Sequence, residues 1–205
     1  MKTFWDRFAF LYDTLQLVNS SVEKGIASAV RGEIKKGMRV MDCAAGTGKY
    51  SLAAAENAIH VTCTDFSKEM LICAMKNARK ANIRNISFAR RDIYSLKDAD
   101  EKYDAVIAAN VMHLLDDPKR AVTELIRVTK KGGKVIIPTF LQGEHTSMKL
   151  LLRIYKLAGF DPKTEFSLES YMQFISEAAE ENDCKEYSTR LISGILPAGF
   201  AVIKK

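Results

Sequence analysis

Apolar and polar positions alternate along this chain with two different periods. Short apolar runs typical of buried strands alternate with longer segments in which apolar residues recur every three or four positions, as on one face of a helix. The strand patterns cover residues 38–43, 59–64, 86–90, 103–109, 133–140, 184–192 and 198–204. The helix patterns cover residues 3–18, 21–34, 48–57, 67–81, 117–130, 146–158 and 167–181. Such alternation predicts an α/β fold, in which crossover helices join parallel strands into a doubly wound sheet with helices on both faces.

The rhythm changes after Phe140, where two helix patterns follow one another before the last two strands. These strands are separated by Gly194, Leu196 and Pro197, which are typical of a hairpin. We therefore predict a seven-stranded sheet that is mostly parallel and ends in an antiparallel hairpin. Earlier in the chain, the run from Lys130 to Gly133 predicts the end of the helix over 117–130.

Composition places the chain among compact globular proteins. It has 205 residues, of which 47% are apolar and 27% charged, and this suits one domain with a substantial core. No stretch approaches the roughly 20 apolar residues of a membrane span, and charges interrupt any signal-peptide core near the N-terminus. The four cysteines show no C-x-x-C spacing. We therefore expect a cytoplasmic, reducing location, with neither a zinc site nor a disulfide framework.

The net charge of +6 is unevenly distributed. Residues 1–39 carry seven Lys or Arg against four Asp or Glu, residues 40–160 nineteen against thirteen, and residues 161–205 five against eight. A solvated helix face explains the central basic excess as well as an RNA surface does. RNA therefore stays an alternative, although not the favoured one.

The most informative segment is VMDCAAGTGKY, residues 40–50, where an apolar strand ends in an acid and turns through small residues. Small residues let a backbone approach a ligand closely. A phosphate-binding P-loop is excluded, because Cys43 stands at its first glycine position and Tyr50 at its hydroxyl position. A dinucleotide fingerprint is weakened, because Ser51 stands at its third glycine position.

Polar groups follow the next three strands as well. Asp65 lies about 20 residues past the turn, at the distance of an acid that binds ribose hydroxyls. Asp92 and Ile93 follow the third strand, and the segment 108–118 follows the fourth. Since ligands bind at the carboxyl ends of the strands in such sheets, we expect these groups to share one site.

These pieces together resemble the class I S-adenosylmethionine-dependent methyltransferases. The matching segments are VMDCAAGTG (40–48), TDFSKEM (64–70), RRDIYSL (90–96), YDAVIAANVMHLLDDP (103–118) and AVTELIRVTKKGGKVIIPTF (121–140). The resemblance covers residues 38–140 and rests on the order and spacing of the segments. The chain departs from the family at Ala44, where the first glycine of the loop usually stands. A Rossmann-like fold is what the resemblance implies.

The resemblance also implies a role for each matching residue. Asp42 would orient the methionine end of S-adenosylmethionine, and the small loop residues would let the backbone pass close to it. Asp65 would bind the ribose, Phe66 and Met70 would pack near the adenine, and Asn110 would offer its carbonyl to the amino group. The implied cofactor residues are Asp42, Ala44, Ala45, Gly46, Gly48, Asp65, Phe66, Met70, Asp92, Ile93 and Asn110, with S-adenosylhomocysteine as the product. Each acid, taken alone, could instead cap a helix or lie in water.

The residues around the acceptor are less defined, because in-line methyl transfer depends mainly on proximity and requires a base only when the acceptor loses a proton. The candidate catalytic residues are His113, near the expected mouth, and Tyr12, on an aromatic helix face; both could be packing residues instead. Glu144 and His145 follow the fifth strand and are weaker candidates. Cys43 and Cys63 lie in predicted strands, where cysteine packs as a small hydrophobe.

The sequence thus predicts a methyltransferase acting on a small or medium-sized acceptor, without a metal. Residues 1–36 would form an N-terminal helical lid, 37–140 the cofactor-binding core, and 141–205 the acceptor-wall helices with the final two strands. The fourth strand lacks the Asn/Asp-Pro-Pro-aromatic motif of nucleobase methylation, and no Pro-Cys pair is present. An RNA methyltransferase, a non-catalytic cofactor-binding protein and a nicotinamide oxidoreductase stay as alternatives. The acceptor, the methylated atom and the oligomeric state are open.

Overall fold

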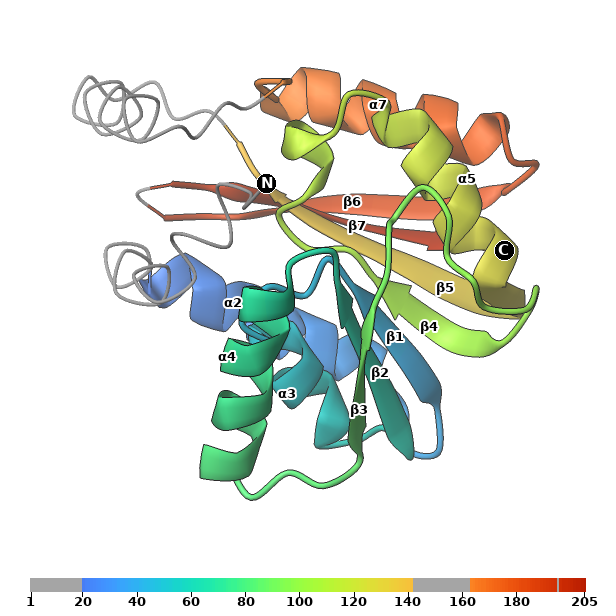
Figure 1. The fold of residues 1–205 in the computed structure, drawn as a ribbon. Helices are drawn as coiled ribbons and strands as arrows, with labels where there is room; N and C mark the ends of the chain where they lie inside the picture. The colour runs from blue at the N-terminus through green and yellow to red at the C-terminus, as the bar shows by residue number, and fades with distance from the viewer. Residues whose placement is uncertain (1–19, 142–162, 195) are drawn as a thin grey trace.

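A seven-stranded sheet organises the computed structural model, which describes residues 20–141, 163–194 and 196–205 (Figure 1). The strand order is β3-β2-β1-β4-β5-β7-β6. The strands are β1 (Arg39–Cys43), β2 (His60–Asp65), β3 (Ile86–Arg90), β4 (Tyr103–Ile107), β5 (Thr129–Phe140), β6 (Glu186–Ile192) and β7 (Ala198–Lys204). The first five strands pair in parallel, whereas β7 is antiparallel to both β5 and β6. The Rossmann-like, mostly parallel sheet with a C-terminal hairpin is therefore confirmed.

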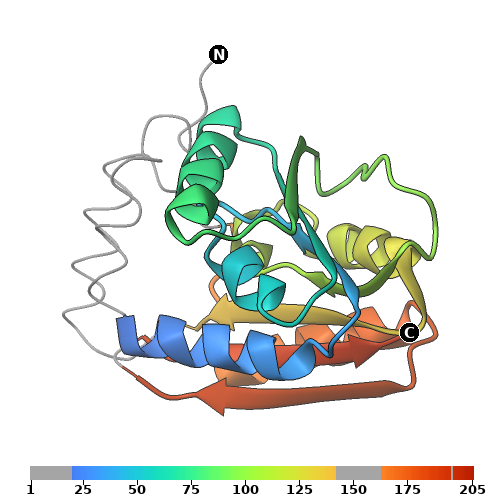
Figure 2. The ribbon, with the colours of Figure 1, turned by 90° about the horizontal axis from the view of Figure 1, so that it is seen from below.

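Helices cover both faces of the sheet (Figures 1 and 2). They are α2 (Ser20–Glu33), α3 (Lys49–Ala55), α4 (Lys68–Lys80), η2 (Met112–Leu114, a 3₁₀ turn), α5 (Pro118–Val128) and α7 (Leu168–Glu180). The first three lie on one face, and α5 and α7 lie on the other. The helices predicted over 3–18 and 146–158 lie outside the described residues.

The central strand β1 is apolar on both faces because both faces are covered. Val40 packs in the cluster with α2 and α3, whereas Met41 and Cys43 pack in the cluster with α5 and α7. One polar residue interrupts this pattern, since Asp42 is fully buried at the end of the strand. The fold therefore places a carboxyl group where the core meets the following loop.

The boundary between α5 and β5 corrects one sequence prediction. The run from Lys130 to Gly133 was expected to end the helix, but α5 already ends at Val128 and the run lies inside β5. The register between β4 and β5 shifts in this region, and Gly132 has a φ of 73°. The glycines thus accommodate an irregularity in a strand. The same residue pattern can also mark the end of a helix, so the sequence alone does not distinguish the two.

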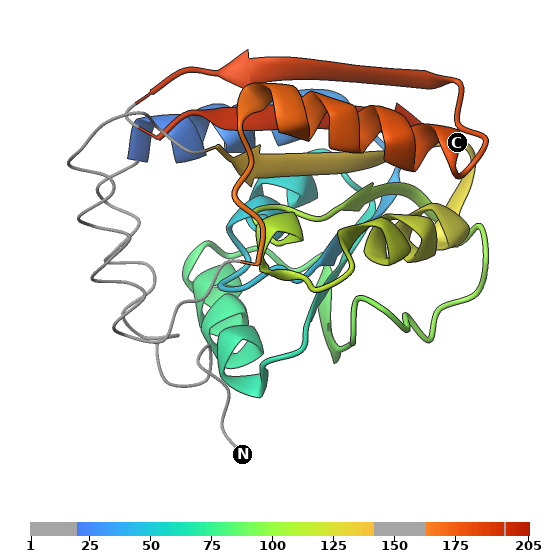
Figure 3. The same ribbon diagram turned by 90° about the horizontal axis from the view of Figure 1, so that it is seen from above.

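The hairpin of β6 and β7 is held against α7 by close packing. Tyr171 of α7 is fully buried, and its hydroxyl donates a hydrogen bond to the Ile137 carbonyl of β5. Its ring lies over Gly199 of β7, where a Cβ atom would be 2.3 Å from the Tyr171 Cε1 atom. Figure 3 shows α7 running along this part of the sheet. A glycine at position 199 is therefore what lets the helix approach the sheet.

The connection between β3 and β4 is organised by Arg127 of α5. Its guanidinium donates to the Leu96 carbonyl at 2.7 Å, to the Asp98 carbonyl at 2.9 Å and to the Asp100 carboxylate. Glu124, one turn earlier, accepts from Arg127 Nε at 2.7 Å and from the Leu96 N–H at 2.7 Å. The helix thereby fixes a connection whose first residues belong to the candidate site.

Candidate functional site

The glycine-rich turn lies at the carboxyl end of β1, between β1 and α3. Ala44, Gly46 and Gly48 all have positive φ values, of 53°, 56° and 83°. The Ala45 N–H donates to the Thr64 carbonyl of β2 at 2.9 Å, and the Gly48 N–H donates to the Ala45 carbonyl at 2.9 Å. Left-handed backbone suits glycine, so Ala44 adopts it at a modest energetic cost. Ala44 thus takes a left-handed conformation at the position where the resemblance leads us to expect a glycine.

Gly48 is constrained by its neighbours as well as by its backbone. A Cβ atom there would lie 3.0 Å from the Cβ and 3.4 Å from the Cα of Ala74 in α4. Small residues on both sides thus let α3, α4 and the loop approach one another. The Thr47 carbonyl accepts from Asn77 Nδ2 of α4 at 3.1 Å, which ties the loop to that helix.

Asp65, at the end of β2, is hydrogen-bonded to the glycine loop. Its Oδ2 accepts from the Gly46 N–H at 2.8 Å, and its Oδ1 accepts from the Ser67 N–H at 2.8 Å. A carboxylate offers about four lone-pair positions, so it can accept several hydrogen bonds at once. The partly exposed Asp65 is thereby oriented rigidly beside the loop.

Asp42 is the buried acid of the site. Ser51 Oγ of α3 donates to Asp42 Oδ2 at 2.6 Å, while Asp42 Oδ1 is buried and has no hydrogen-bond partner among the described residues. Burial raises the pKa of Asp42 to about 7; the Ser51 hydrogen bond opposes this rise, and the negative charge of Asp65 adds to it. The group therefore changes its charge near neutral pH, beneath the glycine loop.

An exposed aromatic ring and a second acid lie at the ends of β2 and β3. Phe66 is 52% exposed, and the Arg90 guanidinium lies 4.9 Å from its ring centroid while Arg90 Nε donates to the Phe66 carbonyl at 2.8 Å. Asp92 is exposed, and its Oδ1 accepts from the Tyr94 N–H at 2.9 Å. Its neighbour Ile93 is buried. Asp92 therefore caps its own turn, which is compatible with a second role toward a ligand.

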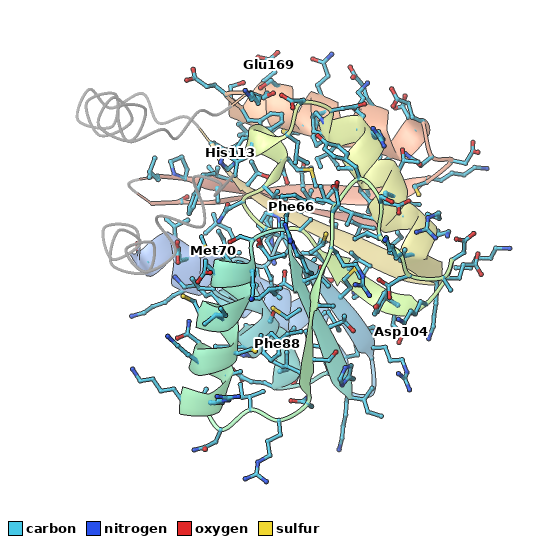
Figure 4. The ribbon with its side chains drawn as sticks, viewed as in Figure 1. Phe66, Met70, Phe88, Asp104, His113 and Glu169 are labelled. Atoms are coloured by element: carbon cyan, nitrogen blue, oxygen red, sulfur yellow. The ribbon has the colours of Figure 1, made fainter. Side chains whose placement is uncertain are left out.

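Met70 is more enclosed than Phe66. It lies in the first turn of α4, its side chain is buried, and its N–H donates to the N-cap Ser67 Oγ at 3.2 Å. Figure 4 shows Met70 and Phe66 at one end of the sheet, whereas Asp104 lies at the other end. Contact with a ligand is thus easier for Phe66 than for Met70.

Asn110 follows β4 in a left-handed conformation, with a φ of 54°. Its side chain bridges two elements, since Nδ2 donates to the Tyr50 hydroxyl at 3.4 Å and Oδ1 accepts from the Phe140 N–H at 3.2 Å. Its own N–H donates to the Pro138 carbonyl at 2.7 Å. Asparagine tolerates this backbone better than most residues. Asn110 is therefore fixed between α3 and the end of β5.

His113 lies in η2, beyond Asn110. Its carbonyl accepts from the Lys163 N–H at 2.8 Å and from the Thr164 N–H at 3.2 Å, so the chain returns to this point after residues 142–162. Burial lowers the pKa of His113 to about 4, because the charged imidazolium is poorly solvated there. The ring is therefore neutral at physiological pH. Tyr12, Glu144 and His145 lie outside the described residues.

Three residues of the site were missed by sequence reasoning. In the sequence, Ser51 stands out only as the residue that replaces the third glycine of a dinucleotide fingerprint. In the structure, its hydroxyl donates a hydrogen bond to Asp42. Thr64 Oγ1 donates to the Asp42 carbonyl at 3.2 Å, and Tyr50 holds Asn110. Each belongs to a predicted strand or helix, and no local pattern distinguishes a supporting hydroxyl from a packed one.

The arrangement fits a nucleoside cofactor with a charged amino-acid end. The exposed Phe66 ring, the Asp65 carboxylate, the glycine loop and the buried Asp42, whose Oδ1 has no partner among the described residues, lie at the adjacent ends of β1 and β2. Burial raises the pKa of the Cys43 and Cys63 thiols, so neither is a nucleophile there. Across the described ranges, no group of three or more His, Cys, Asp or Glu could hold a metal ion. No helix in those ranges is long and apolar enough to cross a bilayer.

Comparisons with known proteins agree with this geometry. Residues 34–187 match a family model described as a methyltransferase domain. The demethylmenaquinone methyltransferase of Renibacterium salmoninarum is 38% identical over 104 residues, which cover 51% of this chain but only 42% of that protein. The chain thus matches less than half the length of this relative.

Solved structures share the fold at lower identity. An S-adenosylmethionine-dependent methyltransferase from Thermotoga maritima has a TM-score of 0.74 at 20% identity, covering 98% of this chain and 99% of the other. A phosphoethanolamine N-methyltransferase from Haemonchus contortus, in complex with S-adenosylhomocysteine, has a TM-score of 0.67 at 17% identity. That match covers 85% of this chain and 50% of the other.

Proposed function

Because this chain belongs to the class I S-adenosylmethionine-dependent methyltransferases, we propose that it transfers a methyl group to a small or medium-sized acceptor. S-adenosylmethionine is the cofactor of this family, and it supplies a methyl group already activated on a sulfonium. The observation that carries the proposal is the Gly46–Asp65 hydrogen bond of 2.8 Å. It joins the glycine loop to the carboxylate that we propose binds the ribose.

The residues at the strand ends each bind a different part of the cofactor. Asp65 accepts hydrogen bonds from the ribose hydroxyls, and Phe66 offers its exposed ring to the adenine beside Asp92 and Ile93. Gly46 and Gly48, which have no side chain, let the loop from Ala44 to Gly48 offer backbone contact to the cofactor. Asn110 presents its carbonyl, which its side-chain bonds to Tyr50 and Phe140 hold in place.

Asp42 contributes a charge that depends on its surroundings. Its Oδ1 has no hydrogen-bond partner in the part of the chain that the structure describes, and a buried carboxyl ionises more readily when a positive group comes near. The ammonium end of the cofactor is such a group. Ser51 holds the other oxygen, so the carboxyl keeps its orientation in either protonation state.

On the acceptor side, we propose His113 as a neutral residue rather than a strong base. Its low pKa leaves it unprotonated at neutral pH, where it could accept a hydrogen bond from an acceptor group. Tyr12 stays a second proposal for contact near the methyl group. In-line transfer gains most from proximity and from the exclusion of water.

Binding and turnover test this proposal separately. Calorimetry with S-adenosylmethionine and S-adenosylhomocysteine should show binding, and Asp65→Asn should weaken it by at least about tenfold, since a charged hydrogen-bond acceptor is lost. Asp183→Asn is the matched control, because it removes one exposed carboxylate on the turn between α7 and β6. An Asp65→Asn protein with unchanged affinity would remove Asp65 from the cofactor site.

A labelled-methyl assay should then search for the acceptor. The panel includes quinol and phosphoamine compounds, suggested by the names of the two relatives, together with RNA. Transfer to a small molecule is the expected result. Methylation of RNA alone, with binding that weakens steeply as salt rises, would favour the RNA alternative. Cofactor binding without transfer to any cell fraction would favour a non-catalytic protein.

A further inference from the structure

Strand β6 lies at the edge of the sheet and, within the described ranges, pairs only with β7. Its register with β7 is continuous from Glu186 to Ile192, and neither a bulge nor a proline interrupts it. Such a strand presents one row of backbone N–H and C=O groups that no neighbouring strand satisfies. Natural proteins cover or disrupt such edges, and no strand in the described ranges covers this one.

Exposed apolar side chains gather beside this edge. Six large hydrophobic residues are exposed in the described part of the chain, and four of them belong to α7 and β6. They are Leu168 (39% exposed), Met172 (47%), Tyr187 (43%) and Leu191 (47%). The Tyr187 hydroxyl lies 2.8 Å from the Ser176 hydroxyl of α7, so Tyr187 faces that helix, and Leu191 shares its face because side chains alternate along a strand.

The helix and the strand have a common midpoint. The chain reverses direction between the end of α7 at Glu180 and the start of β6 at Glu186, so the two elements run antiparallel (Figure 3). Starting from the Ser176–Tyr187 contact, two residues along β6 to Thr189 advance about 6.6 Å. Four residues back along α7 to Met172 cover about 6 Å in the same direction. Met172 therefore lies level with Thr189, the central residue of β6.

We propose that this edge is a dimer interface, in which β6 pairs antiparallel with β6 of a second copy about a twofold axis at Thr189. Such an axis is perpendicular to the sheet, so residues on one face meet residues on the same face. Among registers that obey this condition, the one centred on Thr189 pairs all the residues of β6. The two sheets then become one continuous sheet.

The side chains are self-complementary in this register. Tyr187 lies opposite Leu191 of the second copy, and this apolar pair occurs twice. Glu186 lies diagonal to Arg190 of the second copy on the other face, which places opposite charges near one another. Cross-strand pairs of both kinds stabilise a sheet. A pattern that complements itself favours a second copy over an unrelated partner.

The helices fit the same arrangement. Helix α7 packs against both β6 and β7, and neighbouring strands are about 4.8 Å apart. The two α7 helices would therefore lie about 10 Å apart across the axis, close to the usual helix-packing distance. Met172 would meet its counterpart there, with Leu168 one turn away. The exposed apolar side chains of α7 are thus explained by the same axis as the open strand edge.

Sedimentation velocity on the full chain, over a wide range of protein concentration, tests the interface. We expect a wild-type dimer that dissociates on dilution. Met172→Glu should raise its dissociation constant by at least about thirtyfold, the loss typical of a central interface residue. The control is Ile59→Glu, which places the same charge at a 60% exposed apolar residue just before β2, and this variant should stay dimeric. Circular dichroism verifies that both variants are folded.

Cysteine cross-linking tests the register without depending on Met172. Directly opposite residues of an antiparallel pair have Cα atoms about 4.5–5.5 Å apart, within the range of a disulfide. Thr189→Cys should therefore form a disulfide-linked dimer on a non-reducing gel, whereas Ser188→Cys, which faces Arg190 of the second copy, should not. The wild-type chain controls for its own cysteines.

Three outcomes would overturn the proposal. The first is a wild-type monomer at every concentration; if its β6 amides are protected from hydrogen exchange, another part of the chain covers the edge. The second is a dimer that Met172→Glu leaves intact. The third is a cross-link through Ser188→Cys and none through Thr189→Cys. None of these outcomes bears on cofactor binding, which calorimetry measures separately.

Discussion

The buried carboxyl of Asp42 predicts how the stability of this protein changes with pH. The side chain is fully buried, one oxygen accepts from Ser51, and the other has no partner in the described structure. Replacing Asp42 by Asn keeps the shape and the acceptor for Ser51 but removes the ionisation. The neutral amide thus imitates the protonated carboxyl at every pH.

The magnitude follows from the two pKa values. Burial raises the pKa of Asp42 from 3.8 to about 7 in the folded protein, and each pH unit of difference corresponds to about 1.4 kcal/mol. Between these values the folded state holds a proton that the unfolded state has lost, so stability falls as pH rises. The contribution is fully present below about pH 4 and is lost by about pH 7, a change of about 4 kcal/mol.

Urea unfolding of the wild type and of Asp42→Asn, from about pH 4 to about pH 8, measures this difference. The two proteins should be similarly stable at the acid end, and the Asn variant should become more stable by several kcal/mol at the alkaline end. Titrations of groups that do not interact with Asp42 cancel in the comparison. A difference that stays constant with pH would show that Asp42 ionises normally and would refute the role assigned to its burial.

Three further predictions concern binding and packing. At about pH 6, where Asp42 is mainly protonated, binding of S-adenosylmethionine should release about one proton; calorimetry in buffers of different ionisation enthalpy counts it, and no release would place the cofactor's positive groups away from Asp42. Gly199→Ala should lower the free energy of unfolding by about 1–3 kcal/mol, because its Cβ would meet the Tyr171 ring; an unchanged urea midpoint would contradict that packing. Arg127→Met should cost about 1–3 kcal/mol, since several carbonyl and carboxylate partners lose their donor, and a cost below the error of the urea fit would mean that solvent replaces them freely.

The sequence predicted the sheet well because buried strands differ from their surroundings in hydrophobic pattern. Strand β3 was predicted with its observed bounds, 86–90, and β7 likewise, 198–204. The predicted helix end at Lys130 to Gly133 was wrong, because two glycines after lysines can end a helix or permit an irregularity in a strand. That choice depends on the register with β4, which is a tertiary property.

The candidate site was predictable where the chemistry depends on strand ends. Asp65 and Gly46 were expected at one site, and a hydrogen bond joins them. The role of Ser51 could not be predicted, since it arises only when α3 packs its first turn against the end of β1. The same holds for Tyr50, whose partner Asn110 is distant in sequence.

The guanidinium of Arg127 links the connection between β3 and β4 to helix α5. Segments without regular structure normally open alone, in small fluctuations that leave the rest of the protein folded. Here the carbonyls of Leu96 and Asp98 share one donor group with Glu124, so none of them can separate far without disturbing the others. We therefore expect this connection to open together with the fraying of α5, so that its amide hydrogens exchange at rates similar to those of the helix and more slowly than those of exposed turns.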